Sequence, residues 1–350
     1  SKPIRPYFKI GEMNLIRRLV GTLPDWAQKT HPHMRYLFSG ETKTSLLGRI
    51  IGFLSLLLIL AMFGMIGYAN ASTFFQNNPF ELPVSMFLFE FLFWAMLILQ
   101  VGLAITALLP IVSFISSEKA KNTWDSIRTT HEGTQLLIRA RWSATVFYRL
   151  RPVLIVLWLA RIILIGGLLY DLTAFGGEYL SSLSANITPK LPQWVVLILV
   201  VMGITASLLM PLTSVGINTA LGLWISTWVQ KRLYVAMIQV FLVMVQTLMA
   251  GGFVILFLSI RDEQIINQLL SPTSPQYIPP LGLWLLLLGF SVFTDWGMVF
   301  LYLGLYAGTI WAKIPYGIFL GAGALVVVLL QAFITDRLVA WTIRRAERSE

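Results

Sequence analysis

Long apolar runs separated by short polar segments dominate this chain of 350 residues. A helix that crosses a bilayer needs roughly 20 predominantly apolar residues, because each residue adds only about 1.5 Å of rise. Six runs are long enough, and we predict that each forms a membrane-spanning helix. They cover residues 47–69, 83–115, 150–172, 193–228, 233–260 and 315–341. The pattern therefore predicts an all-α integral membrane protein with six transmembrane helices.

A seventh apolar region, residues 279–312, differs from the other six. It opens with two prolines and carries Asp295 near its middle. We expect a re-entrant helical hairpin that enters from the outer side, breaks between Ser291 and Asp295, and returns to the same side. Such a break is tolerated only where protein surrounds it or where it lines a cavity. The alternative is an ordinary seventh span.

Basic residues decide the orientation of these helices. The segment before the first span carries nine Lys/Arg and three acids, and the connection between the second and third spans carries seven Lys/Arg. The predicted outer loops hold only Lys190 and Arg261. Because loops rich in Lys and Arg stay in the cytoplasm, we expect both termini inside. An even number of crossings follows, which favours the hairpin over a seventh span.

The same reasoning divides the chain into three regions. Residues 1–46 form a cytoplasmic N-terminal region, residues 47–341 the transmembrane domain, and residues 342–350 a basic cytoplasmic tail. Residues 11–23 carry apolar side chains on one helical face, which predicts an amphipathic helix lying in the membrane interface or packed on another protein chain. The longest cytoplasmic loop, 116–149, contains a predicted short helix at 117–127. The alternative for that helix is a solvated charged loop.

The composition excludes several classes of function. Charged residues make up 12% of the chain, against about 25% in a typical soluble domain. There is no cysteine, and the three histidines, His31, His33 and His131, all lie in predicted cytoplasmic segments. We therefore expect no haem between the spans, no thiolate metal site and no bound cofactor. No catalytic set and no phosphate-loop spacing is present, so we predict that the chain is not an enzyme.

The net charge of +10 is accounted for by the cytoplasmic flanks of the spans. It therefore indicates contact with anionic membrane lipids rather than with nucleic acid.

A polar cassette in the 116–149 loop carries the most specific motif. It runs Glu118-Lys119-Ala120-Lys121-Asn122-Thr123-Trp124-Asp125. This stretch resembles the Glu-Arg-x-x-Gly-Thr-Leu-Glu pattern of permease subunits of ABC-2 type transporters. Glu118, Lys119, Thr123 and Asp125 match the pattern, whereas Asn122 stands in place of Gly and Trp124 in place of Leu. His31 to Phe38 and Gly216 to Arg232 are similar to two further stretches of that family.

The resemblance implies a permease subunit in the cytoplasmic (inner) membrane. It would export a lipid-like, glycan or other amphiphilic substrate, with a separate ATPase chain that binds ATP and a second permease as its dimer partner. In that family the cassette docks on the ATPase, so the resemblance makes these residues docking candidates: Glu118, Lys119, Thr123, Trp124, Asp125, Ile127 and Arg128. The alternative is a non-transporting scaffold subunit of a larger membrane complex. It is favoured by the replacement of the Gly and the Pro of the family pattern by Asn122 and Thr130, and by the 12 Trp and 22 Phe.

Three charged residues fall inside the apolar regions, namely Glu90, Arg161 and Asp295. Intramembrane charges of this kind cost roughly 2.5–3.5 kcal/mol on insertion scales, so they usually face the protein interior. Counting residues from the helix ends places Glu90 and Arg161 at similar depths, and we predict an ion pair between them. The pair is either a polar point on a transport path or a neutralised link between helices. Asp295, at the bend of the hairpin, is the better candidate for lining a cavity.

Overall fold

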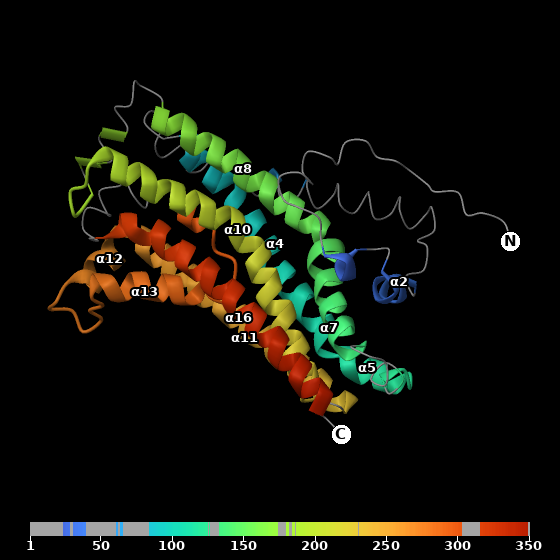
Figure 1. The fold of residues 1–350 in the computed structure, drawn as a ribbon. Helices are drawn as coiled ribbons and strands as arrows, with labels where there is room; N and C mark the ends of the chain where they lie inside the picture. The colour runs from blue at the N-terminus through green and yellow to red at the C-terminus, as the bar shows by residue number, and fades with distance from the viewer. Residues whose placement is uncertain are drawn as a thin grey trace, which may run out of the picture.

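The computed structural model describes most of the chain, and within the described residues every regular element is helical. The described residues are 24–28, 31–39, 61, 64–65, 84–124, 126, 133–173, 180–181, 184–185, 187–229, 231–302 and 316–348. In these ranges five helices are long and apolar enough to cross a membrane (Figure 1). They are α4 (Val84–Val112), α8 (Arg151–Thr173), α10 (Gln193–Ser226), α11 (Arg232–Arg261) and α16 (Leu320–Arg348).

Shorter elements connect these five helices. They are η1 (Asp25–Ala27), α2 (Pro32–Ser39), α5 (Phe114–Ala120), α7 (Gly133–Ser143), η2 (Ala144–Arg149), α12 (Glu263–Leu270), α13 (Pro280–Phe290), η4 (Val299–Leu301) and η5 (Gly317–Phe319). Five of the six predicted spans are thus confirmed as long apolar helices. The first predicted span, 47–69, lies outside the described residues except for positions 61, 64 and 65, and the predicted amphipathic helix at 11–23 lies wholly outside them.

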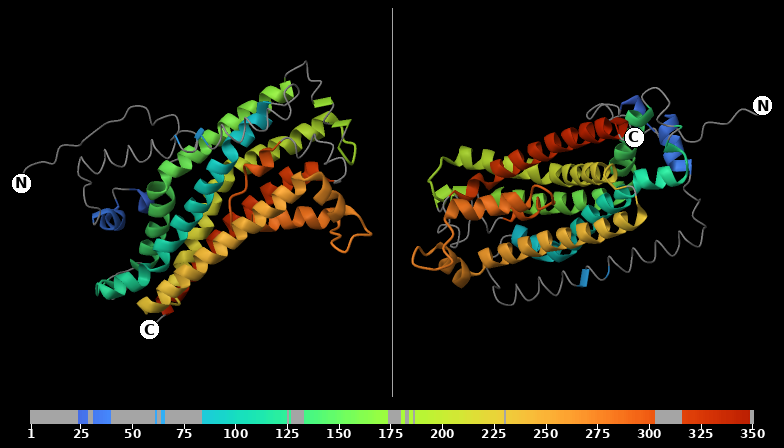
Figure 2. Two further views of the ribbon diagram at one scale, coloured as in Figure 1. Left: turned by 180° about the vertical axis from the view of Figure 1, so that it is seen from behind. Right: turned by 90° about the horizontal axis from the view of Figure 1, so that it is seen from below.

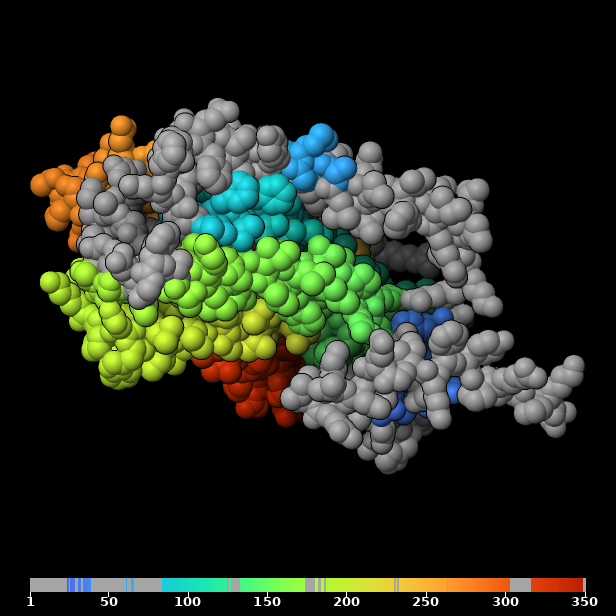
Figure 3. All heavy atoms as spheres, turned by 90° about the horizontal axis from the view of Figure 1, so that it is seen from above, coloured from blue at the N-terminus to red at the C-terminus, as the bar shows by residue number. Residues whose placement is uncertain are grey.

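Helix α10 packs against both α16 and α4, and α8 packs on α4 (Figure 2). Figure 3 shows α4 and α8 side by side on one face of the molecule. Helices α10 and α16 approach closely because two glycines face each other: a Cβ atom on Gly321 would lie only 2.9 Å from the backbone nitrogen of Gly203. Such small residues let two membrane helices gain close van der Waals contact.

Within its described residues, 280–302, the apolar region after α12 reverses direction inside the bundle. Helix α13 starts at the end of the bundle where α11 ends, and the ring of Phe290 at its other end contacts Phe253. After a turn, Tyr302 packs on Phe257, one helical turn closer to the starting end of the bundle. Helix α16 also begins at that end, because the backbone nitrogen of Tyr316 donates to the carbonyl of Thr188 (2.7 Å) just before α10 starts.

The break in this segment lies where the sequence predicts it. Helix α13 ends at Phe290, and residues 291–294 form the turn. Eleven helical residues rise by about 16 Å, which is about half the thickness of a hydrocarbon core of about 30 Å. The turn therefore sits in the middle of the bundle, where its backbone needs partners from the surrounding helices.

A second, smaller core forms at the opposite end of the bundle. It joins α5 and α7 to the ends of α4, α10 and α16, and we call this part of the molecule the stalk (Figure 1). Its buried apolar members are Ile111, Phe114, Ile115, Trp124, Leu137, Ile138, Leu223, Ile343 and Ala346. The stalk is held by packing of its own, in addition to the chain connections to the spans.

The short helix predicted at 117–127 is interrupted in the structure, because residues 121 and 122 form a turn and positions 124 and 126 are helical again. Helix α5 covers Phe114–Ala120, and the backbone then turns at Asn122, whose φ of 56° lies in the left-handed region. Asparagine adopts this conformation more easily than other residues with a side chain, so it ends the helix here.

Candidate functional site

The tip of the hairpin is held by side-chain amides from two long helices. Gln331 of α16 donates through Nε2 to the carbonyls of Ser291 (2.9 Å) and Val292 (3.0 Å). Asn218 of α10 donates through Nδ2 to the carbonyl of Phe293 (3.0 Å). The last carbonyls of a helix have no partner within the helix, and lipid supplies none. These side-chain amides therefore supply hydrogen bonds to backbone carbonyls that would otherwise have no partner where the chain reverses.

An ion pair between α8 and the tip completes this arrangement. Arg161 Nη2 donates to both carboxylate oxygens of Asp295 at 2.6 Å, and Nη1 donates to the carbonyl of Ser207. The backbone nitrogen of Gly297 also donates to Asp295 Oδ1 (3.1 Å). With its amide oriented to satisfy both neighbours, Gln100 of α4 donates to the carbonyl of Asp295 (3.2 Å) and accepts from Arg161 Nη2 (3.1 Å).

Burial makes this pair costly to break. Arg161 is 1% exposed and Asp295 is 5% exposed. Transfer of either charge from water costs several kcal/mol, which the partner charge and well-placed hydrogen bonds must offset. The pair is closed from solvent, so the geometry favours a neutralised link between helices over a polar point on an open path.

The predicted ion pair between Glu90 and Arg161 is wrong. Glu90 instead binds Arg261, with Oε1 2.5 Å from Nη2. The residue of α4 that lies beside Arg161 is Gln100, about 15 Å further along the helix than Glu90 at a rise of about 1.5 Å per residue. Counting residues from the ends of two helices does not account for how far one helix is displaced along the other or for the tilt between them. It therefore predicts the wrong partner for Arg161.

In the cassette, the carboxylate of Glu118 is turned into the protein. It accepts hydrogen bonds from the hydroxyls of Thr123 (2.7 Å) and Tyr36 (2.8 Å), and Lys121 Nζ lies 3.5 Å away. Helix α5 follows the apolar stretch of α4, so this carboxyl lies outside the span. Burial raises the pKa of Glu118, but the two hydrogen bonds and the charge of Lys121 outweigh it and hold the pKa below its ordinary value of 4.5.

The docking candidates of the cassette divide into buried and exposed residues. Glu118 and Trp124 are buried, with 4% and 3% exposure. Lys119 and Thr123 are half-buried, and the side chain of Lys121 is 63% exposed. Among the described residues of the cassette, Ala120, Lys121 and Asn122 are exposed and therefore accessible to a partner. The remaining candidates, Asp125, Ile127 and Arg128, lie outside the described residues.

Sequence reasoning missed the amides that hold the tip, namely Gln100, Asn218 and Gln331. A fourth amide, Gln246 of α11, donates to Asn218 Oδ1 (2.9 Å). Each is an isolated Asn or Gln within an apolar run, and that isolation is the signal that could have identified them. Uncharged amides raise the cost of insertion less than charges do, so they stand out less in a hydropathy pattern.

The described residues include no group of three or more His, Cys, Asp or Glu side chains that could hold a metal ion. Comparisons with models of protein families, with curated proteins and with solved structures find no match for this chain.

Proposed function

We propose that the chain is the membrane-spanning permease subunit of an ABC-2 type transporter. It would act with a separate ATPase subunit and a second permease, and it would export a lipid-like, glycan or other amphiphilic substrate. The proposal rests on the resemblance of the cassette to that family and on the structure that the cassette adopts.

The observation that carries the proposal is that four described residues of the cassette, Glu118, Asn122, Thr123 and Trp124, each have a structural role. The acid and the threonine of the pattern, Glu118 and Thr123, are hydrogen-bonded to each other at 2.7 Å. Asn122 stands where the pattern has glycine, and its φ of 56° is one that glycine adopts readily and asparagine tolerates. Trp124 stands where the pattern has leucine, and it is buried in the apolar core of the stalk. Both replacements therefore fit the same local structure.

The attachment of the cassette supports a role in transmitting force. The core of the stalk joins α5 to the ends of α4, α10 and α16 through Ile111, Leu223 and Ile343. The indole nitrogen of Trp142 on α7 also donates to the carbonyl of Gly216 on α10 (3.0 Å). Because close-packed interiors transmit displacement, a push on α5 would move these spans together.

The docking surface in this proposal is formed by the exposed Lys121 and Asn122 and the half-buried Lys119 beside them. These three residues would contact the ATPase, whereas Glu118 and Trp124 would hold the cassette in shape from inside. The two lysines give this end a positive charge, which is suited to an acidic surface on the partner.

The proposed topology has six spans, a re-entrant hairpin at 279–312, and both termini in the cytoplasm. The return of the chain to one end of the bundle between residues 280 and 316 supports the hairpin. At the other end, Arg345 stacks on the exposed ring of Trp228 with 3.4 Å between the guanidinium carbon and the ring centroid. Aromatic and basic side chains gather in this way at a cytoplasmic membrane interface.

The test is purification from native membranes in mild detergent, followed by identification of the bound chains and measurement of ATP hydrolysis in liposomes. We expect a stoichiometric partner chain with a phosphate-loop motif. The double variant Lys119→Glu/Lys121→Glu should then lose ATPase binding. The matched control, Lys231→Glu/Arg344→Glu, makes the same change of charge at exposed positions on the same end and should retain binding.

Two results would contradict the proposal at different points. Purification with other membrane subunits and without any ATPase would favour the scaffold alternative. Binding of an ATPase that is equally strong in both double variants would retain the permease assignment but remove the docking role of the lysines.

A further inference from the structure

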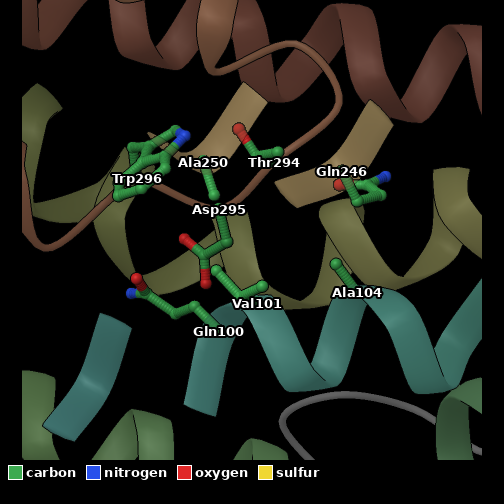
Figure 4. A pocket seen from close by; sticks show the side chains of 8 residues that line it. All are labelled: Gln100, Val101, Ala104, Gln246, Ala250, Thr294, Asp295 and Trp296. Carbon is green, nitrogen blue, oxygen red and sulfur yellow. The ribbon is translucent and has the colours of Figure 1, made fainter. Parts of the chain in front are cut away.

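An open groove lies between α10 and α16, toward the end of the bundle where both helices begin. It has a volume of about 360 Å³, and its lining residues are Leu197, Ile198, Val201, Met202 and Thr205 of α10 and Leu325 of α16. By contrast, the polar cavity between α4, α11 and the hairpin tip has a volume of about 10 Å³ (Figure 4). Sites for small molecules usually have volumes of about 300–1,000 Å³. Of these two spaces, only the groove can therefore hold part of a ligand.

The groove follows from the close contact of α10 with α16 (Figure 2). A Cβ atom on Gly203 would lie 3.4 Å from the Cα atom of Gly321. Because a helix with its side chains is about 10 Å across, two helices that approach this closely leave a furrow beside the line of contact. Met202 and Thr205 lie beside Gly203 in sequence, and Leu325 follows Gly321 by one helical turn. These side chains form the walls of the furrow.

The walls of the groove are apolar and open to the surroundings of the protein. Leu197, Ile198 and Val201 are between 43% and 50% exposed. The hydroxyl of Thr205 donates to the carbonyl of Val201 (2.9 Å), so the one hydroxyl of the lining already has a partner within its own helix. At this depth the surroundings are hydrocarbon, since the groove belongs to two helices that are long and apolar enough to cross a membrane.

The groove has the length and the depth of an acyl chain in one leaflet. From Leu197 to Thr205 is eight residues, or about 12 Å along the helix, and one leaflet contributes about 15 Å of hydrocarbon. Trp194, one helical turn before Ile198, is 66% exposed, and tryptophan gathers at the membrane interface. Lys190, which is also exposed, precedes α10 at the same end. Along the chain, a basic residue and an interfacial ring thus come before the apolar groove.

We propose that this groove binds one acyl chain of a phospholipid from the leaflet at the end where α10 begins. The chain lies along α10 from Leu197 to Thr205, with its headgroup end toward Trp194. Lys190 supplies a positive charge at the level of the phosphate, a group that lysine commonly binds. In the proposed topology this is the outer leaflet. The inference rests on the membrane spans and does not depend on the transporter function.

The lining disfavours other occupants. Ordered water needs two to four polar partners, and a free phosphate needs donors or positive charge, neither of which the apolar walls supply. A helix of a second copy is too thick, because a 12 Å length of a helix about 10 Å across occupies roughly 900 Å³. It could touch the rim of the groove but could not fill it. A flexible acyl chain is the apolar group of suitable width that the membrane itself supplies.

The test is a structure of the whole chain in nanodiscs that contain a phospholipid and a neutral diacylglycerol, together with native mass spectrometry of the protein released from them. We expect continuous, unbranched density along the groove and at least one retained phospholipid per chain. The variant Val201→Phe fills the groove and should lose this density and retain one phospholipid fewer. The matched control Val326→Phe makes the same change at a 63% exposed position of α16 outside the lining, and should keep both.

The wild-type measurements decide the question even if a variant does not fold. A groove that is closed by its own side chains, that lacks continuous density, or that is covered by a second copy would overturn the proposal. Retention of diacylglycerol as often as phospholipid would also overturn it, because the headgroup would then play no part. Equal loss of phospholipid in Val201→Phe and Val326→Phe would show that the retained lipid does not occupy the groove.

Discussion

The ion pair between Arg161 and Asp295 should stabilise the bundle only as a pair. Removal of one partner leaves the other charge buried without compensation, which typically costs about 3–5 kcal/mol. Replacement of both partners by neutral groups removes that penalty and is often close to neutral. We therefore expect Arg161→Met and Asp295→Asn each to lower the free energy of unfolding by about 3–5 kcal/mol. The double variant Arg161→Met/Asp295→Asn should cost less than either single change.

The burial of the pair sets this magnitude. The side chains of Arg161 and Asp295 are 1% and 3% exposed, so water cannot replace a lost partner. The pair of Glu90 and Arg261 is a matched comparison, because the side chain of Arg261 is 23% exposed. In the corresponding cycle with Glu90→Gln and Arg261→Met, water reaches the Arg261 side of the pair, although the side chain of Glu90 is only 5% exposed. We therefore expect a coupling energy smaller than that of Arg161 and Asp295.

Both cycles can be measured by unfolding in mixed micelles with increasing fractions of sodium dodecyl sulfate. The intrinsic fluorescence of the 12 tryptophans reports the transition. The coupling energy is the difference between the cost of the double variant and the sum of the two single costs. Additive costs at Arg161 and Asp295, or a coupling no larger than at Glu90 and Arg261, would refute the reasoning that burial makes the first pair indispensable.

Two further predictions concern the stalk and the contact between α10 and α16. Because the folded pKa of Glu118 is lowered, its stabilising contribution is complete above the ordinary value of 4.5 and is lost as the pH falls through the lower folded pKa. The difference in melting temperature between the wild type and Glu118→Gln should thus shrink below pH 4.5, and a constant difference would contradict this. Gly321→Ala places a Cβ against the backbone of Leu199 and Gly203 and should cost about 1–3 kcal/mol in the same micelle assay. The control Gly166→Ala, with nothing within 4 Å, should be close to neutral, and equal costs would count against the close contact.

The long helices could be predicted because the surrounding lipid determines the secondary structure of each apolar run independently of the rest of the chain. A run of apolar residues long enough to cross a bilayer satisfies its backbone only as a helix, whatever its neighbours are. The break of the hairpin was predictable for a similar reason. Ser291 and Asp295 interrupt an apolar stretch that opens with proline, and the structure ends α13 at Phe290. These features depend on short segments of sequence, so no knowledge of packing is needed.

The partners of the polar groups could not be predicted in this way. Arg161 meets Asp295 across 134 positions of sequence, and Gln331 meets Ser291 across 40. Such pairs depend on the shift and rotation of whole helices, which are determined by contacts such as that between Gly203 and Gly321. The buried orientation of Glu118 could not be predicted for the same reason. One of its partners, Tyr36, belongs to an element 82 positions away in sequence.

Three helices connect the core of the stalk to the tip of the hairpin in the middle of the bundle. Helices α4, α10 and α16 each contribute an apolar residue to the core of the stalk and an amide to the tip of the hairpin. The amides are Gln100, Asn218 and Gln331. The separations along the helices are about 16, 8 and 18 Å at a rise of about 1.5 Å per residue. These stretches are continuous helix, apart from the proline at position 110 of α4.

A displacement of the cassette would therefore reach the hairpin through three rigid connections. The stalk cannot move independently of the spans, because its apolar core packs on the ends of these helices. The tip of the hairpin is attached to the same three helices, because its backbone carbonyls accept hydrogen bonds from their side-chain amides. Under the proposed function, this double attachment provides a physical route from an ATPase in the cytoplasm to the outer half of the membrane. The hairpin would then move with the spans, because separation from them would leave buried carbonyls and a buried charge without partners.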